Sequence, residues 1–341
     1  MEIKPVTNPN DWDKFLASRE NTLFVQSSGY GEFYKKLGEK SWIFGLYDGG
    51  ELVGGSLVVS THAKRGNFLY LPYGPILPPE SRADALAAIT NYIADFARQT
   101  GEYAFLRVSP FLEATAENQK MFARNAYRPA PMHVLAETTW LLDLRPSEAE
   151  LLDGMGKNHR NLIRRCQKDG VKIVRTDQAP ELDNFYKIYR TTARRHKFHK
   201  FSESYIKNEF KTFADRGEAL LYLGFLSDGR LDSAAIVIYY QNMACYRHGA
   251  SLNLNKKNPT SYLLQWEAIR EAKSRGMGHY NFWGIAPAGA SRRHPFWGIT
   301  HFKKGFSGYA LNLVHCQDYP LTKQYYLNWL IESVRRIRRG F

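Results

Sequence analysis

Two stretches of the chain share one order of apolar and polar positions. Each begins with two alternating apolar runs joined by an Asp-Gly turn, LYDGGELVGGSLVV from Leu46 and LSDGRLDSAAIVIY from Leu226. Alternation on both sides of such a turn is typical of a β-hairpin, because successive side chains of a strand point to opposite faces. The pattern therefore predicts one hairpin in each half of the chain.

Each hairpin is followed by the same further elements. A short apolar run, FLYLPYGPIL or ACYRHGASL, predicts a third strand, and a segment with helical spacing follows at 81–100 and at 260–274. Apolar residues recur there every three to four positions, which predicts one buried face on each helix. Another strand pattern comes next, EYAFLRVS or HYNFWG. The order hairpin, strand, helix, strand thus occurs twice.

This order predicts an α+β fold with mixed, mainly antiparallel sheets flanked by helices. It is the core order of GNAT-like acyltransferases, so we expect two tandem GNAT-like domains. We expect the first domain at residues 1–143 with a C-terminal helix from 318–341, and the second at 144–317. A chain of 341 residues is long enough to bury two such cores.

One string resembles a cofactor loop. The run QSSGYG from Gln26 matches the loop with which GNAT enzymes hold the pyrophosphate of coenzyme A, but it precedes the repeated unit. No such loop stands before either repeated helix, so we interpret the run as the start of a helix at 29–37. The three cysteines lie far apart and outside any metal-binding pattern. We therefore expect no metal, no cofactor and an acyl donor other than acyl-CoA.

The charge of the chain indicates a polyanionic partner. The formal net charge is +14, and Lys and Arg crowd three segments, at 157–175, 194–200 and 335–339. Nucleic acid, an anionic membrane surface and a phosphorylated substrate all fit this charge. No apolar run is long enough to cross a membrane and the N-terminus lacks a signal-peptide pattern, so we expect a cytoplasmic protein.

The stretch from Asn281 to Gly308 carries the most distinctive chemistry. It joins a buried-strand pattern to a loop with two arginines and ends in HFKKGF. Two lysines beside a strand usually keep their charged ends in water. Phe302 and the phenylalanine of the following turn flank this pair, and an ammonium in apolar surroundings suits contact with an anion. If the segment is a strand, Lys303 and Lys304 point to opposite faces.

In order and spacing these segments resemble the FemABX family of aminoacyltransferases, which use aminoacyl-tRNA to extend the stem peptide of peptidoglycan precursors. The resemblance covers nearly the whole chain and rests on YLPYGPI, GMGKNHRNLIRRCQKDGVKIV, YRHGAS, the helix with Gln265 and Trp266, NFWG and HFKKGFSG. It implies the compact form without a coiled-coil arm, because only 170–191 separates the basic helix from the next. It also implies that a C-terminal helix at 321–339 completes the first domain.

The resemblance gives roles to particular residues. It implies that Lys303 stabilises the charge of the reacting ester or of substrate phosphates, and that Tyr205 contacts the pyrophosphate of a sugar nucleotide. The basic partner of that tyrosine is displaced, with Phe201 at the aligned place and Lys200 the nearest candidate. Further candidates for substrate binding are Phe302, Tyr246, His248, Arg292 and Arg293. A lone histidine such as His248 more often has a structural role, and an arginine loop is often only solvated.

A phosphate-binding lysine of the family falls on Glu32, while Lys35 and Lys36 lie one helical turn further along. We take Lys36 as the candidate. For tRNA, contacts to phosphates are enough, because the acceptor stem is recognised largely by shape and charge. The predicted helix 157–168 places Arg160, Arg164 and Lys168 on one face, so we expect that face, with the arginine-rich tail, to bind tRNA.

The implied reaction is attack of a stem-peptide amine on an aminoacyl ester, and a fixed ammonium suits the oxyanion that forms. We expect a monomer that binds aminoacyl-tRNA and either UDP-MurNAc-pentapeptide or a lipid-linked precursor. Two alternatives stay open. One is an acyl-CoA-dependent or envelope-polysaccharide N-acyltransferase of the same fold, and the other is a non-catalytic protein that binds nucleic acid or an anionic surface.

The tail helix allows two interpretations. Trp329, Leu330, Val334 and Ile337 stand beside its arginines, a combination that suits peripheral contact with the inner membrane surface. The family resemblance implies instead that this helix packs on the first domain. We prefer packing on the domain and keep membrane contact as the second interpretation.

Overall fold

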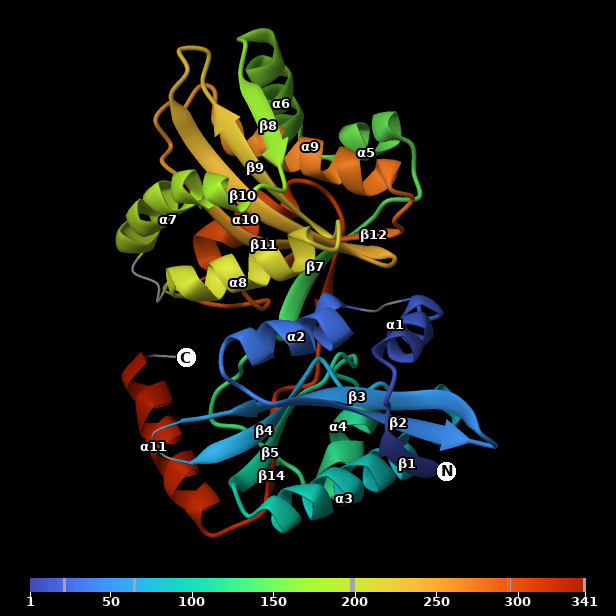
Figure 1. Cartoon of the computed structure of the whole chain (residues 1–341). Coiled ribbons are helices and arrows are strands. Elements are labelled where there is room, and N and C mark those ends of the chain that lie inside the picture. The colour runs from blue at the N-terminus through green and yellow to red at the C-terminus, as the bar shows by residue number, and fades with distance from the viewer. Residues whose placement is uncertain (21–22, 64–65, 197–199, 293, 295, 340–341) are drawn as a thin grey trace. The chain divides into compact units, whose positions relative to one another are not determined.

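The computed structural model describes residues 1–20, 23–63, 66–196, 200–292, 294 and 296–339. They form two compact units, one of residues 1–137 and 312–341 and the other of residues 138–311. Within the described residues, each unit contains one seven-stranded sheet with helices packed on it (Figure 1). The predicted α+β class is confirmed. No helix in this part of the chain is long and apolar enough to cross a membrane.

The first unit is built on the sheet β1-β2-β3-β4-β5-β14-β6. Only β4 and β5 are parallel, and the other neighbours among its described strands are antiparallel. Its elements are β1 (Glu2–Pro5), α1 (Pro9–Ala17), α2 (Ser28–Lys36), β2 (Ser41–Asp48), β3 (Glu51–Thr61), β4 (Asn67–Pro72), α3 (Arg82–Thr100), β5 (Tyr103–Ser109), α4 (Ala116–Arg124), β6 (Arg128–Pro129), β14 (Gln317–Pro320) and α11 (Gln324–Arg339).

The second unit is built on the sheet β13-β7-β12-β11-β10-β9-β8, in which β11 and β12 are parallel. Its elements are β7 (Thr138–Asp143), α5 (Glu148–Gly154), α6 (Lys157–Lys168), β8 (Lys172–Thr176), α7 (Leu182–His196), α8 (Glu203–Ala214), β9 (Ala219–Phe225), β10 (Leu231–Tyr240), β11 (Met243–Ser251), α9 (Thr260–Ser274), β12 (His279–Gly284), α10 (Trp297–Lys304) and β13 (Tyr309–Asn312).

The predicted repeat is confirmed in both units. The hairpin β2–β3, strand β4, helix α3 and strand β5 of the first unit correspond to β9–β10, β11, α9 and β12 of the second. In each unit the strand after the helix lies parallel to the strand before it, because a helical crossover returns the chain to the same edge. The helices bury the faces that their spacing predicts, with Leu86, Ile89 and Ile93 in α3 and Leu263, Leu264 and Ile269 in α9.

The run that resembles a cofactor loop is a structural cross-link in the first unit. The Gln26 side chain is 2% exposed, donates to the carbonyl oxygen of Pro72 and accepts from the backbone nitrogen of Leu57. Ser27 then caps α2 by accepting from the backbone nitrogen of Tyr30. The run is therefore the start of a helix, as the sequence predicted. The side-chain amide of Gln26 makes its hydrogen bonds inside the fold.

The C-terminal segment completes the first unit through a buried ion-pair cluster. β14 lies between β5 and β6, and α11 follows it. Arg107 of β5, whose side chain is 4% exposed, donates to Asp318 at 2.7 Å and to Glu332 of α11 at 2.7 Å. The ring of Tyr325 packs against Phe105, with centroids 5.4 Å apart. These contacts attach α11 to the first unit.

Replacing Arg107 should therefore destabilise the first unit strongly. Arg107→Met leaves the buried carboxylate of Asp318 unpaired, and we expect the free energy of unfolding to fall by about 3–5 kcal/mol in urea melts. Arg98→Met is the matched control. It removes an exposed ion pair with Asp95 and should change the same quantity by less than about 0.5 kcal/mol. Equal losses in the two variants would contradict this account of α11.

Candidate active site

The HFKKGF segment is the end of a helix, so the possibility that it is a strand is wrong. α10 runs from Trp297 to Lys304, so Phe302 belongs to its last turn and Phe306 follows just after its end. Their ring centroids lie 5.2 Å apart. Lys303 is buried and Lys304 is exposed, because successive helical residues are rotated by about 100°.

Lys303 is a buried amine. Its side chain belongs to a residue that is 6% exposed, and Nζ donates to the carbonyl oxygen of Gly284, at the end of β12, at 2.6 Å. Nζ also lies 6.0 Å from the ring centroid of Tyr246. No ion pair joins Lys303 to a carboxylate within the described residues, and burial lowers the pKa of its ammonium from 10.5 to about 7. Near neutral pH the group is therefore close to half protonated.

The rest of the motif joins α10 to the start of α6. The His159 ring nitrogen Nε2 lies 2.9 Å from the carbonyl oxygen of Phe302, and the backbone nitrogen of Gly156 donates to the carbonyl oxygen of Gly305 at 2.9 Å. A Cβ at Gly305 would lie 1.9 Å from Cε1 of His159, so this position needs glycine for space. Phe306 is fully buried. Burial lowers the pKa of His159, which favours a neutral ring in this junction.

A β-bulge in β11 brings two neighbouring basic residues to one carboxylate. Strand β10 pairs with Tyr246 and His248 of β11 and skips Arg247 between them. Arg247 Nε donates to Glu209 Oε1 at 2.9 Å, and His248 Nε2 lies 2.7 Å from Glu209 Oε2. Neighbouring residues of a regular strand point to opposite faces, so this convergence depends on the bulge.

The charges in this cluster are balanced inside the fold. Glu209 is 1% exposed, and its burial would raise its pKa, but the charge of Arg247 and the hydrogen bond from His248 outweigh burial and hold the pKa at about 2. Burial lowers the pKa of His248 despite the neighbouring carboxylate. His248 therefore holds Glu209 through its Nε2 nitrogen.

Arg247 also reaches the tyrosine that the family resemblance singled out. Its Nη2 donates to the hydroxyl of Tyr205 at 3.1 Å, and its guanidinium lies 5.3 Å from the ring centroid of Trp283. Phe201 stacks on Tyr205 with centroids 4.6 Å apart. Sequence reasoning missed Glu209 and Arg247. The only signal was the charged pair in YRHGAS, and nothing in the sequence indicates the bulge that turns both side chains to α8.

The remaining candidates are dispersed. Lys200 and Arg292 are exposed, and Arg293 lies outside the described residues. Lys36 is exposed at the end of α2 in the first unit, one turn from Glu32. The described contacts thus bring Lys303 to Tyr246 and join Tyr205, His248 and Arg247 in a second group, while Phe302 packs on His159, Tyr262 and Phe306.

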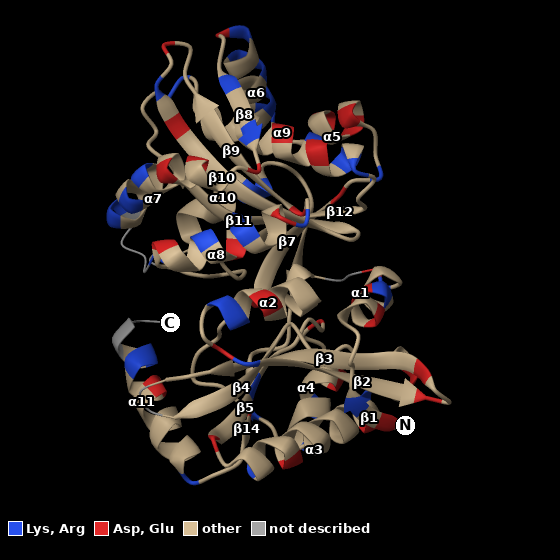
Figure 2. Ribbon diagram, in the orientation of Figure 1, with Lys and Arg blue, Asp and Glu red and all other residues tan. Residues whose placement is uncertain are grey.

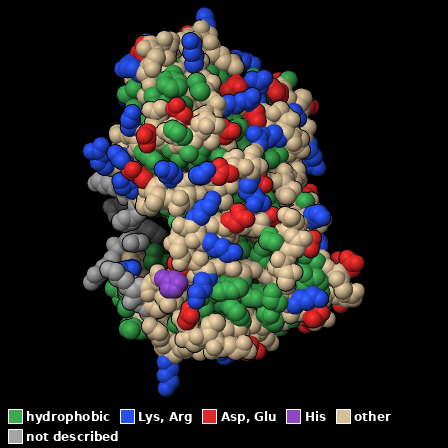
Figure 3. Space-filling model, viewed as in Figure 1, with side chains coloured by type: hydrophobic (Ala, Val, Ile, Leu, Met, Phe, Trp, Pro, Cys, Tyr) green, Lys and Arg blue, Asp and Glu red, His purple; other side chains and the backbone are tan. Residues whose placement is uncertain are grey.

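The basic helix is confirmed with the predicted bounds (Figure 2), and the three cations predicted to bind tRNA differ in their surroundings. Arg160 is half-buried and donates to the carbonyl oxygens of Asp153 and Met155, so it caps the end of α5. Arg164 and Lys168 are exposed. On the face of the molecule that Figure 3 shows, basic and acidic side chains are interspersed. Lys157 and Arg165 of α6 are exposed as well, so this helix presents a local basic surface that includes Arg164 and Lys168.

The start of α9 already holds an anion. This is where a GNAT enzyme of the acyl-CoA type binds pyrophosphate, on the free backbone nitrogens of a helix N-terminus. Here the carboxylate of Asp232, 1% exposed, accepts from the hydroxyl of Thr260 at 2.8 Å and from the backbone nitrogen of Leu254 at 2.7 Å. A second anion at this helix start would be repelled, which supports the expectation of another acyl donor.

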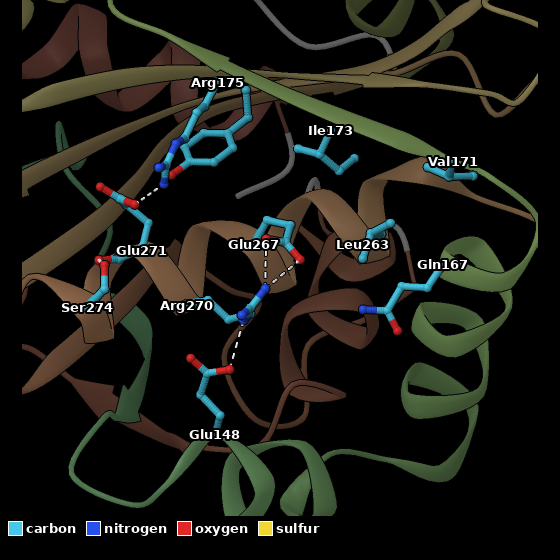
Figure 4. Close-up of a pocket in the computed structure, with 11 residues that line it drawn as sticks. Glu148, Gln167, Val171, Ile173, Arg175, Leu263, Glu267, Arg270, Glu271 and Ser274 are labelled. Atoms are coloured by element: carbon cyan, nitrogen blue, oxygen red, sulfur yellow. Dashed lines mark hydrogen bonds and ion pairs between the residues drawn. The ribbon is translucent and has the colours of Figure 1, made fainter.

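A cavity of about 670 Å³ lies elsewhere in the second unit, beside α9 (Figure 4). Its charged walls pair with one another: Arg270 with Glu148 at 2.8 Å and with Glu267 at 3.2 Å, and Arg175 with Glu271. None of its lining residues is a predicted site residue. No group of His, Cys, Asp or Glu in the described residues has the arrangement of a metal site.

Known structures share this fold. The chain superposes on the crystal structure of FemX with a TM-score of 0.83 and 18% identity, over 97% of this chain and 100% of that one. A tandem GNAT protein from the clavulanic acid biosynthesis pathway superposes with a TM-score of 0.60 and 14% identity, over 94% and 98%. The tandem GNAT-like architecture is thus confirmed.

Sequence comparison then identifies the family. The profile of the FemAB family matches residues 7–140, 130–226 and 231–332, and the chain belongs to this family. It is 24% identical to the UDP-N-acetylmuramoylpentapeptide-lysine N(6)-alanyltransferase of Weissella viridescens, over 82% of this chain and 87% of that protein. It is 20% identical to a lipid II:glycine glycyltransferase of Staphylococcus epidermidis, over 98% and 96%. The predicted family resemblance is confirmed.

The junction of α6 and α10 predicts a position-specific effect of adding one methyl group. Gly305→Ala should reduce the free energy of unfolding by about 1–3 kcal/mol, because the new Cβ meets His159. Gly298→Ala in the same helix has no atom within 4 Å of the new Cβ and should leave stability unchanged or slightly higher. Combining Gly305→Ala with His159→Ala should remove most of the extra cost, and an unchanged cost in that background would contradict the clash.

Proposed function

We propose that this protein is an aminoacyltransferase that moves an amino acid from aminoacyl-tRNA to an amine of the stem peptide of a peptidoglycan precursor. Membership of the FemAB family and the names of the two relatives support this class of reaction. The observation on this chain that carries the proposal is the buried ammonium of Lys303. It belongs to the family motif in α10 and donates to the carbonyl oxygen of Gly284 at the end of β12. We propose a cytoplasmic site of action, since aminoacyl-tRNA is made there.

The reaction needs placement and charge stabilisation more than a protein nucleophile. The acceptor amine attacks the ester carbonyl, a C–N bond forms, and the carbonyl oxygen becomes an oxyanion. The C–O bond to the tRNA ribose then breaks, and the proton lost by the amine passes to the ribose hydroxyl. In its protonated form Lys303 supplies a fixed positive charge for the oxyanion, in surroundings where a charge acts strongly.

The ring of Tyr246 lies 6.0 Å from this ammonium, and Phe302 packs nearby in the chain on Tyr262 and Phe306. Tyr246 lies flat over Gly249, since a Cβ at Gly249 would sit 1.7 Å from the tyrosine hydroxyl. The Glu209–Arg247 pair fixes Tyr205, which we propose as a contact for the phosphates of the acceptor. Exposed cations can also bind phosphate, and we propose three of them as further phosphate contacts: Lys200, Lys36 and Arg292.

The acyl-CoA alternative is less well supported. The start of α9 holds Asp232 and the first turn of α3 holds Asp84, so both repeated helices begin beside a carboxylate where coenzyme A would place its pyrophosphate. The purely nucleic-acid-binding alternative explains the charge of +14 but gives no reason to bury Lys303. Incubation with charged tRNA and with acetyl-CoA, each beside UDP-MurNAc-pentapeptide and a lipid-linked precursor, separates these three functions by the label that is transferred.

Lys303→Met should abolish transfer and stabilise the fold. Loss of an oxyanion donor costs about 100- to 1000-fold in kcat, measured as label transferred from aminoacyl-tRNA. The ammonium has an ordinary pKa of 10.5 and a folded pKa of about 7, so between these values the unfolded chain binds more protons and stability rises with pH. Below pH 7 the cost of burial is fully present, and removing it should raise the free energy of unfolding by about 2 kcal/mol after the lost hydrogen bond is counted.

The matched control is Lys304→Met, which removes the exposed neighbour and should retain transfer and stability. The stability gain of Lys303→Met should shrink as the pH is raised from 7 towards 10. Full transfer by Lys303→Met would refute the catalytic role. A loss of transfer accompanied by lower stability at pH 7 would point to a structural role instead.

The basic face of α6 predicts a salt-dependent effect on tRNA affinity. Arg164→Glu with Lys168→Glu should weaken tRNA binding and flatten the plot of log K against log salt by about 1.5 units, because two phosphate contacts are lost. Lys120→Glu with Arg124→Glu is the matched control, since both are exposed one turn apart on α4 of the first unit. Filter binding over a salt series measures both slopes. Equal slopes in the two variants would remove α6 from the tRNA surface.

A further inference from the structure

The C-terminal helix α11 lies beside the sheet of the first unit and packs on it with a side that mixes aromatic and polar residues (Figure 1). Tyr325, Asn328 and Glu332 follow one another at intervals of three and four, and their contacts and burial define the inner side of α11. Tyr325 and Asn328 are 1% and 4% exposed, and Glu332 accepts from the buried Arg107. Surface helices usually bury an apolar stripe, whereas the inner side of α11 combines the Tyr325 ring with the polar Asn328 and the charged Glu332.

The opposite side of α11 is apolar and open to solvent. We call it the outer face and define it by five residues at helical spacing, which are Tyr326, Leu327, Leu330, Val334 and Ile337. They are 49%, 56%, 55%, 41% and 77% exposed, respectively. Scattered exposed apolar residues need no explanation, but five on one side of one helix form a continuous stripe about 17 Å long. Nothing else in the described residues covers it.

Basic residues surround this stripe. Lys323 precedes it, Arg335 and Arg336 are exposed near its end, and the guanidinium of Arg128 lies 5.6 Å from the ring centroid of Tyr326. The sequence of the last turns adds Arg338 and Arg339. The one acid of α11, Glu332, is turned inward to Arg107. The electrostatic potential around the stripe is therefore positive.

We propose that the outer face of α11 is a docking surface for an anionic phospholipid bilayer. An apolar stripe flanked by Lys and Arg is the pattern of a helix that lies in the membrane interface, with its apolar side among the acyl chains and its cations at the headgroups. The inner face fixes this helix to the folded unit, so packing on the domain and membrane contact occur together. This surface goes beyond the proposed transfer reaction and is tested without it.

A second copy of the chain fits the outer face less well. Leu327, Leu330, Val334 and Ile337 have the three-four spacing of a coiled-coil seam, but they fill only two heptads. Pairing two such helices would also bring their arginines together, with no outward acid on α11 to neutralise them. A bilayer with anionic headgroups supplies the opposite charge.

The test is co-sedimentation of the full chain with vesicles of phosphatidylcholine alone and of phosphatidylcholine mixed with phosphatidylglycerol. We expect binding to the mixed vesicles that weakens as salt is added. Leu330→Asp with Ile337→Asp should lower this binding about tenfold or more. Val174→Asp with Leu254→Asp is the matched control, because these side chains are 47% and 45% exposed in the second unit and the charge change is equal. Equal thermal melts of both variants establish that folding is unaffected.

Arg335→Gln with Arg336→Gln separates the charge from the stripe, and each lost arginine should weaken binding to the anionic vesicles by about fivefold. No binding of the parent protein to anionic vesicles would overturn the proposal, as would binding that Leu330→Asp with Ile337→Asp leaves unchanged. So would a parent dimer in sedimentation velocity that this variant converts to a monomer, since the outer face would then belong to a second copy.

Discussion

The burial of one amine, Lys303, is the constraint on which the second unit is organised. An ammonium without a neighbouring carboxylate is costly to bury, and the fold holds it with the Gly284 carbonyl oxygen and the ring of Tyr246. Helix α10 keeps it there because Gly305 leaves room for His159 and Phe306 enters the core. Burial lowers the pKa of Lys303 to about 7, which means that the buried position of this amine reduces the stability of the fold.

Buried charged residues make different contacts in the two repeated units. In the first, Arg107 pairs with Asp318 and Glu332 and attaches the C-terminal helix. In the second, the β11 bulge directs Arg247 to Glu209 and so fixes Tyr205 beside an aromatic wall.

Attachment of α11 through polar contacts has a consequence for its other side. Because Asn328 and Glu332 satisfy the inner face, the leucines of the outer face are not needed for the core and stay in solvent. The sequence pattern alone is compatible with burial of those leucines in the core and with their contact with a membrane. Only the position of Arg107, on a strand more than 200 residues away in sequence, decides which side is turned inward.

The sequence by itself determined the repeat, the tandem GNAT-like order, the basic helix 157–168 and Lys303 as the residue of interest, because these depend on local periodicity and on motif spacing. It did not determine that HFKKGF ends a helix. Phe302 and Phe306 pack on His159 of α6, and this contact between distant segments is visible only in the folded structure. Nor did the sequence reveal that Arg160 is used as a helix cap or that Glu209 and Arg247 meet. Those facts are contacts between distant segments, and tertiary packing alone fixes them.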